Sequence, residues 1–141
     1  IIITKKGMSI HFETKGIAAI GRVTAGVNGI NLADDDEVLV GLPIRNEKDT
    51  VAVFTALGCA KKTELSEFPL QGRGGKGVSI TPKNDFAGAV FITKEDSRIL
   101  FVMPSGVKSE SARQIPLHSR VNTGVQIIKP IGKIAHVVLG S

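Results

Sequence analysis

The residues best suited to chemistry in this chain lie in one short stretch, 71–77, which reads Gln-Gly-Arg-Gly-Gly-Lys-Gly. Glycine allows positive φ and lets another molecule approach the main chain closely. Arginine offers a planar fork and lysine a mobile point charge, and both suit a phosphate. The stretch therefore predicts a loop that holds a phosphate backbone, with a glycine-rich turn bearing solvated charges as the alternative.

The same stretch matches two nucleotide-binding patterns only in part. Gly72, Gly74 and Gly77 satisfy the dinucleotide fingerprint G-x-G-x-x-G, but that motif must follow a strand and open a helix. Here residues 78–82 read Val-Ser-Ile-Thr-Pro, a strand cut by proline. Lys76 also lacks the Ser or Thr that follows the lysine of a P-loop. We therefore expect no nucleotide and no other cofactor.

No other group of side chains has the spacing of a catalytic or metal site. The acidic run 34–37 reads as a solvated turn, since consecutive acids point in different directions and no downstream Glu completes a calcium loop. The three histidines, His11, His118 and His136, are far apart in sequence and lack metal-ligand spacing. The sequence therefore predicts no catalytic residue and no metal ligand.

Composition indicates one globular domain with a modest positive charge. The 141 residues are 42% apolar and 22% charged, and their net charge of +5 favours a polyanionic partner. No apolar run is long enough for a transmembrane helix or a signal peptide, and the single Cys59 fits a reducing, cytoplasmic location. The chain has no Trp and no Tyr, so it lacks their aromatic platforms for unpaired bases and any tyrosine nucleophile.

Two sequence markers repeat in phase along the chain. The pattern Arg-x-x-x-Gly-Val begins at Arg22, Arg73 and Arg120, and a second series places glycines after apolar runs, at Gly7, Gly58 and Gly106. The spacing of about fifty residues lies in the range of propeller-type repeats. The markers predict three units in one domain, approximately residues 1–44, 45–93 and 94–141.

Each unit reads as four short strands, because runs rich in Val, Ile, Thr and Phe alternate with Gly, Pro, Asn and Asp. The expected strands are 1–4, 9–13, 26–30 and 37–42, then 50–55, 60–65, 77–81 and 87–93, and finally 98–103, 107–111, 124–129 and 133–139. The only helix candidate is a single turn over 63–68, which Pro69 ends. The sequence predicts an all-β chain.

Four-stranded units of this length imply propeller blades, each with an apolar face towards its neighbours. Three blades leave two such faces open. We therefore expect a fragment of a larger ring, and the alternative is a complete three-unit assembly, alone or paired with a second copy.

The repeats, the run 24–32 (Thr-Ala-Gly-Val-Asn-Gly-Ile-Asn-Leu) and the 71–77 stretch resemble the C-terminal domain of the A subunit of bacterial DNA gyrase and its topoisomerase IV relative. The resemblance covers essentially the whole chain. Its specific part is the gyrase A box, which reads glutamine, basic, arginine, glycine, glycine, basic, glycine. The chain departs from the box at Gly72, which replaces a basic residue, and one repeat precedes the box, which in the family lies in the first blade.

The resemblance implies a β-pinwheel, a propeller-like ring of four-stranded blades of which about three are present here. In this family a basic rim bends duplex DNA, and that wrapping supports ATP-dependent supercoiling by a type II topoisomerase. The resemblance also implies that the domain is not catalytic, since the cleavage tyrosine lies elsewhere in the A subunit, whereas the B subunit hydrolyses ATP. The implied partners are duplex DNA of any sequence, the B subunit, and the rest of the A subunit, with no membrane.

The predicted DNA contacts are cations at equivalent places in the repeats together with the box. They are Gln71, Arg73, Gly74, Gly75, Lys76, Gly77, Arg22, Arg120, Lys61, Lys62 and Lys108. Such contacts with phosphates carry little sequence information. Two alternatives are a propeller domain that binds protein through its rim and a free-standing architectural DNA-binding protein. Wrapping is favoured if Arg22, Arg73, Lys76 and Arg120 all lie on one outer edge, and protein binding is favoured if they scatter and the rim has an apolar patch.

Overall fold

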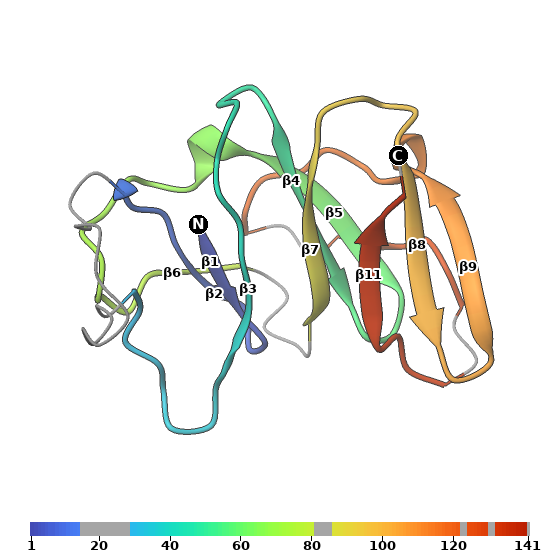
Figure 1. The fold of residues 1–141 in the computed structure, drawn as a ribbon, viewed down its shortest axis with the longest axis horizontal. Helices are drawn as coiled ribbons and strands as arrows, with labels where there is room; N and C mark the ends of the chain where they lie inside the picture. Colours follow the sequence, from blue (N-terminus) through green and yellow to red (C-terminus); the bar gives the residue numbers. More distant parts are fainter. Residues whose placement is uncertain (15–28, 81–85, 122–123, 130–131, 141) are drawn as a thin grey trace, which may run out of the picture.

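The computed structural model describes residues 1–14, 29–80, 86–121, 124–129 and 132–140, which form strands and two short 3₁₀ turns (Figure 1). This confirms the all-β prediction. Arg22 and the expected strand residues 26–28 and 81 lie outside the described ranges. The strands are β1 (Ile2–Thr4), β2 (Met8–Ile10), β3 (Val38–Gly41), β4 (Thr50–Thr55), β5 (Cys59–Glu64), β6 (Val78–Ser79), β7 (Phe86–Ile92), β8 (Arg98–Met103), β9 (Gly106–Ser111), β10 (Val125–Gln126) and β11 (His136–Leu139). The 3₁₀ turns are η2 (Leu65–Glu67), inside the expected helical turn, and η3 (Ala112–Gln114).

The first two strands of every unit form a hairpin. The repeated glycine lies in the turn in the first two units and directly after it, as the first residue of β9, in the third. The three glycines have positive φ, at 91° for Gly7, 94° for Gly58 and 134° for Gly106. Side chains other than glycine rarely adopt this backbone conformation. The hydroxyl of Thr4 accepts a hydrogen bond of 3.0 Å from the backbone N–H four residues later, and Thr55 does the same. The sequence marker therefore corresponds to the hairpin connection in each unit, and the first two units share the same turn.

The strands assemble into three antiparallel sheets in the orders β3-β1-β2-β6, β10-β5-β4-β7 and β11-β8-β9. The expectation that the four strands of one unit form one blade is wrong. Strand β6 of the second unit pairs with β2 of the first, with Val78 opposite Ser9. Strand β10 of the third unit pairs with β5 of the second, with Val125 opposite Ala60. Each unit thus completes the sheet that precedes it, a pairing that strand periodicity within one unit does not encode.

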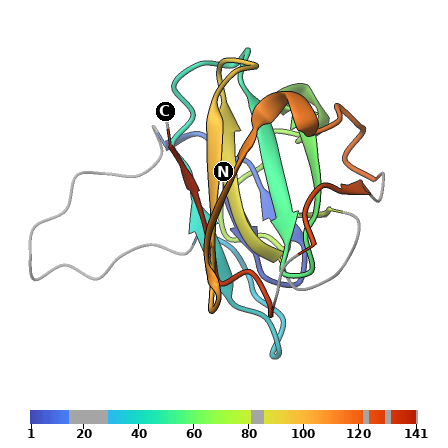
Figure 2. The same ribbon diagram turned by 90° about the vertical axis from the view of Figure 1, so that its right-hand side faces the viewer.

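Among the described residues, two apolar cores lie between the three sheets. Strand β4 contributes to both, because Val51 and Val53 pack towards the first sheet while Ala52 and Phe54 pack towards the third. A strand buried on both faces reads as a continuous apolar run, as 50–55 does. Phe54 also meets Phe101 of the third sheet edge-to-face, with ring centroids 5.4 Å apart. This double burial explains why the sheets stack as one body (Figure 2).

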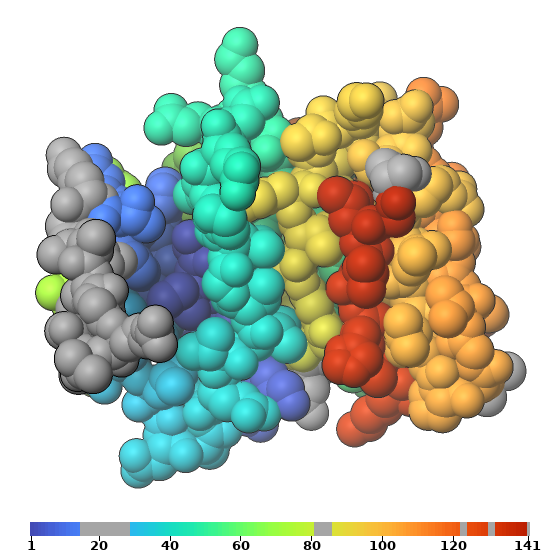
Figure 3. Space-filling view, viewed as in Figure 1, coloured from blue at the N-terminus to red at the C-terminus, as the bar shows by residue number. Residues whose placement is uncertain are grey.

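The sheets lie next to one another so that β3, β7 and β11 run side by side on one face of the molecule (Figures 1 and 3). In the sheet orders, β6, β10 and β9 are at the opposite edges. The chain segments that lead into β6 and β10 therefore lie at the edge away from β3, β7 and β11. One of these segments contains the 71–77 loop.

Candidate nucleic-acid interface

The 71–77 loop is fixed to the first unit by its backbone. The N–H of Gln71 donates to the carbonyl of His11 at 2.7 Å. Further along, the N–H of Gly74 donates to the carbonyl of Gly29 at 2.6 Å, and the carbonyl of Gly75 accepts from Asn31 at 2.8 Å. Three backbone hydrogen bonds therefore give the loop a defined shape, although it has no regular secondary structure.

Glycine is required at the end of the loop by both conformation and space. Gly77 has a φ of 79°, and a Cβ atom there would lie 2.1 Å from the carbonyl oxygen of Ser9. Gly74 also has positive φ, at 84°. The close approach of Gly77 lets the next residues enter the first sheet as β6. The glycines of the loop thus give it its shape and also allow β6 of the second unit to pair within the sheet of the first.

The two cations of the loop, Arg73 and Lys76, are both exposed. They come from a loop of fixed backbone that leads into β6, so both cations lie in one exposed segment. Gly72 is also exposed, and a Cβ atom there would meet nothing within 4 Å. Packing therefore does not impose the departure from the box at this position.

A second segment, in the third unit, shares two backbone features with the 71–77 loop. The N–H of His118 donates to the carbonyl of Lys62 at 2.9 Å, as Gln71 does to His11 one repeat earlier. Gly124 has a φ of 77°, and its Cβ would lie 2.8 Å from the carbonyl oxygen of Ala60. The backbone anchor before the Arg-x-x-x-Gly-Val pattern and the glycine within it are therefore repeated in these two units.

The Arg120 side chain of the third-unit loop turns towards the protein, whereas Ser119 and Val121 beside it are exposed. Arg120 is half-buried, and its guanidinium Nε donates to the carbonyl of Glu67 at 2.9 Å while Nη1 donates to the carbonyl of Ser79. Its backbone N–H also donates to a carboxylate oxygen of Glu67 at 3.2 Å. Although Arg120 occupies the position equivalent to Arg73, these bonds direct it to the second unit.

Lys61 lies in the interior, with 1% of its surface exposed, so the prediction that it presents its charge on the rim is wrong. Its ammonium group donates to the carbonyls of Ser119, at 3.1 Å, and Arg120. Burial and, to a smaller extent, the nearby Arg120 lower the pKa of Lys61 to about 8, while Glu67 opposes the shift. Since the ammonium group is directed at backbone carbonyls, it does not present a charge to a phosphate outside.

The other predicted cations are placed differently from one another. Lys62 is half-buried, and its ammonium group is 3.4 Å from the carbonyl of Ala112. Lys108 is exposed on β9. The structure thus brings Arg73 and Lys76 into one exposed loop, with Lys108 on a separate sheet.

The sequence predicted only that His11 lies in the strand 9–13, and it did not predict that His11 anchors the segment leading into the 71–77 loop. Its carbonyl accepts from Gln71, and its ring Nδ1 lies 2.9 Å from the carbonyl of Phe68. His11 follows Gly7 by the same number of residues as Lys62 follows Gly58. Counting from the turn glycines would have identified these two positions as equivalent.

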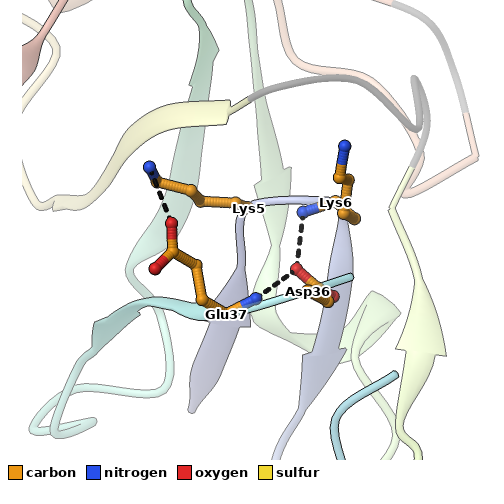
Figure 4. A network of polar contacts seen from close by, with 4 residues as sticks. All are labelled: Lys5, Lys6, Asp36 and Glu37. Carbon is orange, nitrogen blue, oxygen red and sulfur yellow. Dashed lines mark hydrogen bonds and ion pairs between the residues drawn. The ribbon is translucent and has the colours of Figure 1, made fainter. Parts of the chain in front are cut away.

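The acidic run reads as a turn in the structure too, and it contacts the β1–β2 hairpin (Figure 4). A carboxylate oxygen of Asp36 accepts from the backbone N–H of Lys6 at 3.0 Å and of Glu37 at 2.8 Å. The ammonium group of Lys5 forms an ion pair of 2.9 Å with Glu37. Over the described ranges, no three His, Cys, Asp or Glu side chains are grouped so that they could hold a metal ion. Nor does that part of the chain contain a helix with the length and apolar character needed to cross a membrane.

Comparison with known proteins agrees with this architecture. The structure superposes on the C-terminal domain of DNA topoisomerase IV with a TM-score of 0.89 and 23% identity, covering 98% of this chain and 45% of that one. It superposes on the DNA gyrase A C-terminal domain with a TM-score of 0.81 and 20% identity, covering 98% and 49%. These likenesses confirm the fold, a β-pinwheel of the propeller type.

Sequence comparison points to the same group of proteins. The chain is 31% identical over 134 residues to the DNA gyrase A subunit of Mycobacterium leprae (strain TN), a match that covers 91% of this chain and 10% of that protein. The chain therefore spans about a tenth of the length of this relative. The family described as DNA gyrase C-terminal domain, beta-propeller, matches residues 1–42 and 49–86, more than half of the chain. The chain belongs to the family of DNA gyrase C-terminal domains.

Proposed function

We propose that this chain is a non-catalytic module that binds duplex DNA and bends it around its outer edge. The observation that carries the proposal is the 71–77 loop, which presents Arg73 and Lys76 from a backbone held by three hydrogen bonds to the first unit. Arginine and lysine on a fixed backbone suit phosphate oxygens of DNA. The net charge of +5 supports a polyanionic ligand.

The loop cations support wrapping better than base recognition. Backbone phosphates are the same for every sequence, so contacts from Arg73 and Lys76 would fix the path of the duplex without selecting bases. Bending would then depend on charge and on the deformability of DNA, and affinity would fall steeply with salt. If about six phosphates were neutralised in all, affinity would fall roughly a thousandfold between low and moderate salt.

We further propose that the module works within the A subunit of a cytoplasmic, ATP-dependent type II topoisomerase, together with the B subunit. Family membership supports this assignment. The absence of tyrosine from the sequence means that this chain cannot itself form a tyrosyl-phosphate bond with DNA. Cleavage and ATP hydrolysis therefore belong to other parts of that enzyme in this proposal.

The test compares the chain with a variant that combines Arg73→Ala and Lys76→Ala. The matched control combines Lys48→Ala and Lys94→Ala, which remove the same charge from exposed positions outside the loop. Binding to a duplex is measured by fluorescence anisotropy at several salt concentrations, and bending by the linking number of circles ligated in the presence of protein. We expect the loop variant to lose most of the linking-number change and to lower the salt slope by about two.

The outcomes separate wrapping from the alternatives. If the loop variant loses more bending than binding, and the control variant loses neither, the result supports the loop as the element that bends DNA. Unchanged circle topology in the loop variant would overturn the assignment of the 71–77 loop. A wild-type chain that binds no duplex at low salt would overturn DNA binding altogether and favour the protein-binding alternative.

A further inference from the structure

Arg120 contacts both ends of the segment that contains the 71–77 loop. Its Nε donates to the carbonyl of Glu67, the last residue of η2, and its Nη1 donates to the carbonyl of Ser79, the last residue of β6. Glu67 precedes the loop and Ser79 follows it. One side chain of the third unit thus holds together the two stems of a loop in the second.

Arginine suits this position better than lysine. The guanidinium group is planar and carries five N–H donors in a fixed fork, so it can bond to two carbonyls at once in a set geometry. Hydrogen bonds from a charged donor are also stronger than neutral ones. Because Arg120 is half-buried, water competes less with its two acceptors.

The backbone of Arg120 is itself held by hydrogen bonds to two side chains of the second unit. Lys61, buried on β5, donates from its ammonium group to the carbonyls of Ser119 and Arg120. The N–H of Arg120 donates to the Glu67 carboxylate at 3.2 Å. The guanidinium group therefore starts from a backbone that is fixed relative to the second sheet.

We propose that Arg120 is a positioning residue that fixes the 71–77 loop from the neighbouring unit, with Lys61 holding Arg120 in place. This inference rests on the proposed DNA-wrapping function of the loop. A loop whose two stems are joined loses less conformational freedom when it binds, so its cations meet the phosphates in a set geometry. In this way the third unit controls the angle at which the second unit bends DNA.

The test uses Arg120→Lys, which keeps the positive charge but removes the planar fork. In the DNA-free chain, hydrogen exchange is measured at the amides of Gln71 and Gly74, which the loop uses as anchors. We expect their exchange to accelerate at least tenfold, while the amides of β8 (Arg98–Met103) exchange as in the wild type. Glu67→Ala is the second variant. It removes the acceptor for the Arg120 N–H and the negative charge near Lys61 but keeps the carbonyl that accepts from Nε, so we expect a smaller acceleration.

The same variants are then tested on DNA by salt-dependent binding and circle topology. We expect Arg120→Lys to lose at least half of the linking-number change with an unchanged salt slope. Unchanged exchange at Gln71 and Gly74 in both variants would overturn the proposal. So would an Arg120→Ala variant with normal exchange and a salt slope lowered by about one, which would make Arg120 a direct phosphate contact. If the wild-type chain fails to wrap DNA, the proposed function fails, while the exchange experiment still tests whether Arg120 fixes the loop.

Discussion

Gly77 connects the 71–77 loop to the exchanged strand β6, and Gly77→Ala tests whether this connection controls stability. An added Cβ would lie 2.1 Å from the carbonyl oxygen of Ser9, at a residue with a φ of 79°. Both the conformation and the contact are unfavourable for alanine. The backbone at Gly77 must therefore move away from β2, and β6 must move with it.

The expected cost follows from these two effects. An alanine at positive φ costs about 1–2 kcal/mol. Displacing β6 would also weaken its pairing with β2 and the bond of 2.6 Å from the N–H of Ile80 to the carbonyl of Gly7. Losing one bond of the β6–β2 pairing together with the Ile80–Gly7 bond would cost about 1–3 kcal/mol. The free energy of unfolding should therefore fall by about 2–5 kcal/mol, a large fraction of a typical domain stability of about 5–15 kcal/mol.

The assay is urea unfolding of three alanine variants in parallel, followed by circular dichroism. Gly124→Ala has the same kind of φ but a looser contact of 2.8 Å, so its cost should be smaller than that of Gly77→Ala. Gly72 has open space around it and no positive φ, so the Gly72→Ala variant should unfold with an unchanged free energy or one raised by up to about 1 kcal/mol. Equal stability of the Gly77→Ala and Gly72→Ala variants would contradict this explanation. Recovery in Gly77→Asn would show that φ matters and the contact with Ser9 does not, since asparagine tolerates positive φ.

Three further predictions concern charge. Gly72→Lys should restore the missing cation of the box without steric cost, raising the salt slope of DNA binding by about one and affinity roughly fivefold to tenfold near 0.1 M salt, as measured by anisotropy. Burial lowers the pKa of Lys61 from 10.5 to about 8. Between pH 8 and pH 10.5 the unfolded chain therefore binds more protons than the folded chain, so the free energy of unfolding should rise with pH across that range. Urea titrations at several pH values should show this rise diminished in Lys61→Met and kept in Lys62→Met. Breaking the exposed ion pair of Lys5 and Glu37 should change stability by less than about 1 kcal/mol in a double-mutant cycle.

Much of the fold could be predicted because its signals are local. The strand runs 50–55 and 98–103 match β4 and β8 residue for residue, and the turn glycines mark the three hairpins. Alternation of apolar residues and the need for glycine at positive φ depend only on neighbouring positions. The partner of β6 was predicted wrongly, because pairing in a sheet depends on contacts between residues far apart in sequence.

The candidate site shows the same division. The types and spacing of residues 71–77 predicted an exposed basic loop, and the structure places Arg73 and Lys76 there. Lys61 and Arg120 were predicted to have the same role, since a cation in a repeat looks the same whichever way it points. In the structure both are directed to backbone carbonyls instead.

Three repeats of short strands, with glycine-containing turns and one cationic loop, follow from the order of residues along this chain, because these features express local conformational preference. The completion of each sheet by the following unit does not follow from it and arises from packing between units. The same packing selects which cations face solvent and which hold the units together. Those outcomes depend on the apposition of carbonyls and N–H groups from different units, such as Arg120 with Glu67 and Ser79, and this apposition exists only after the sheets have packed.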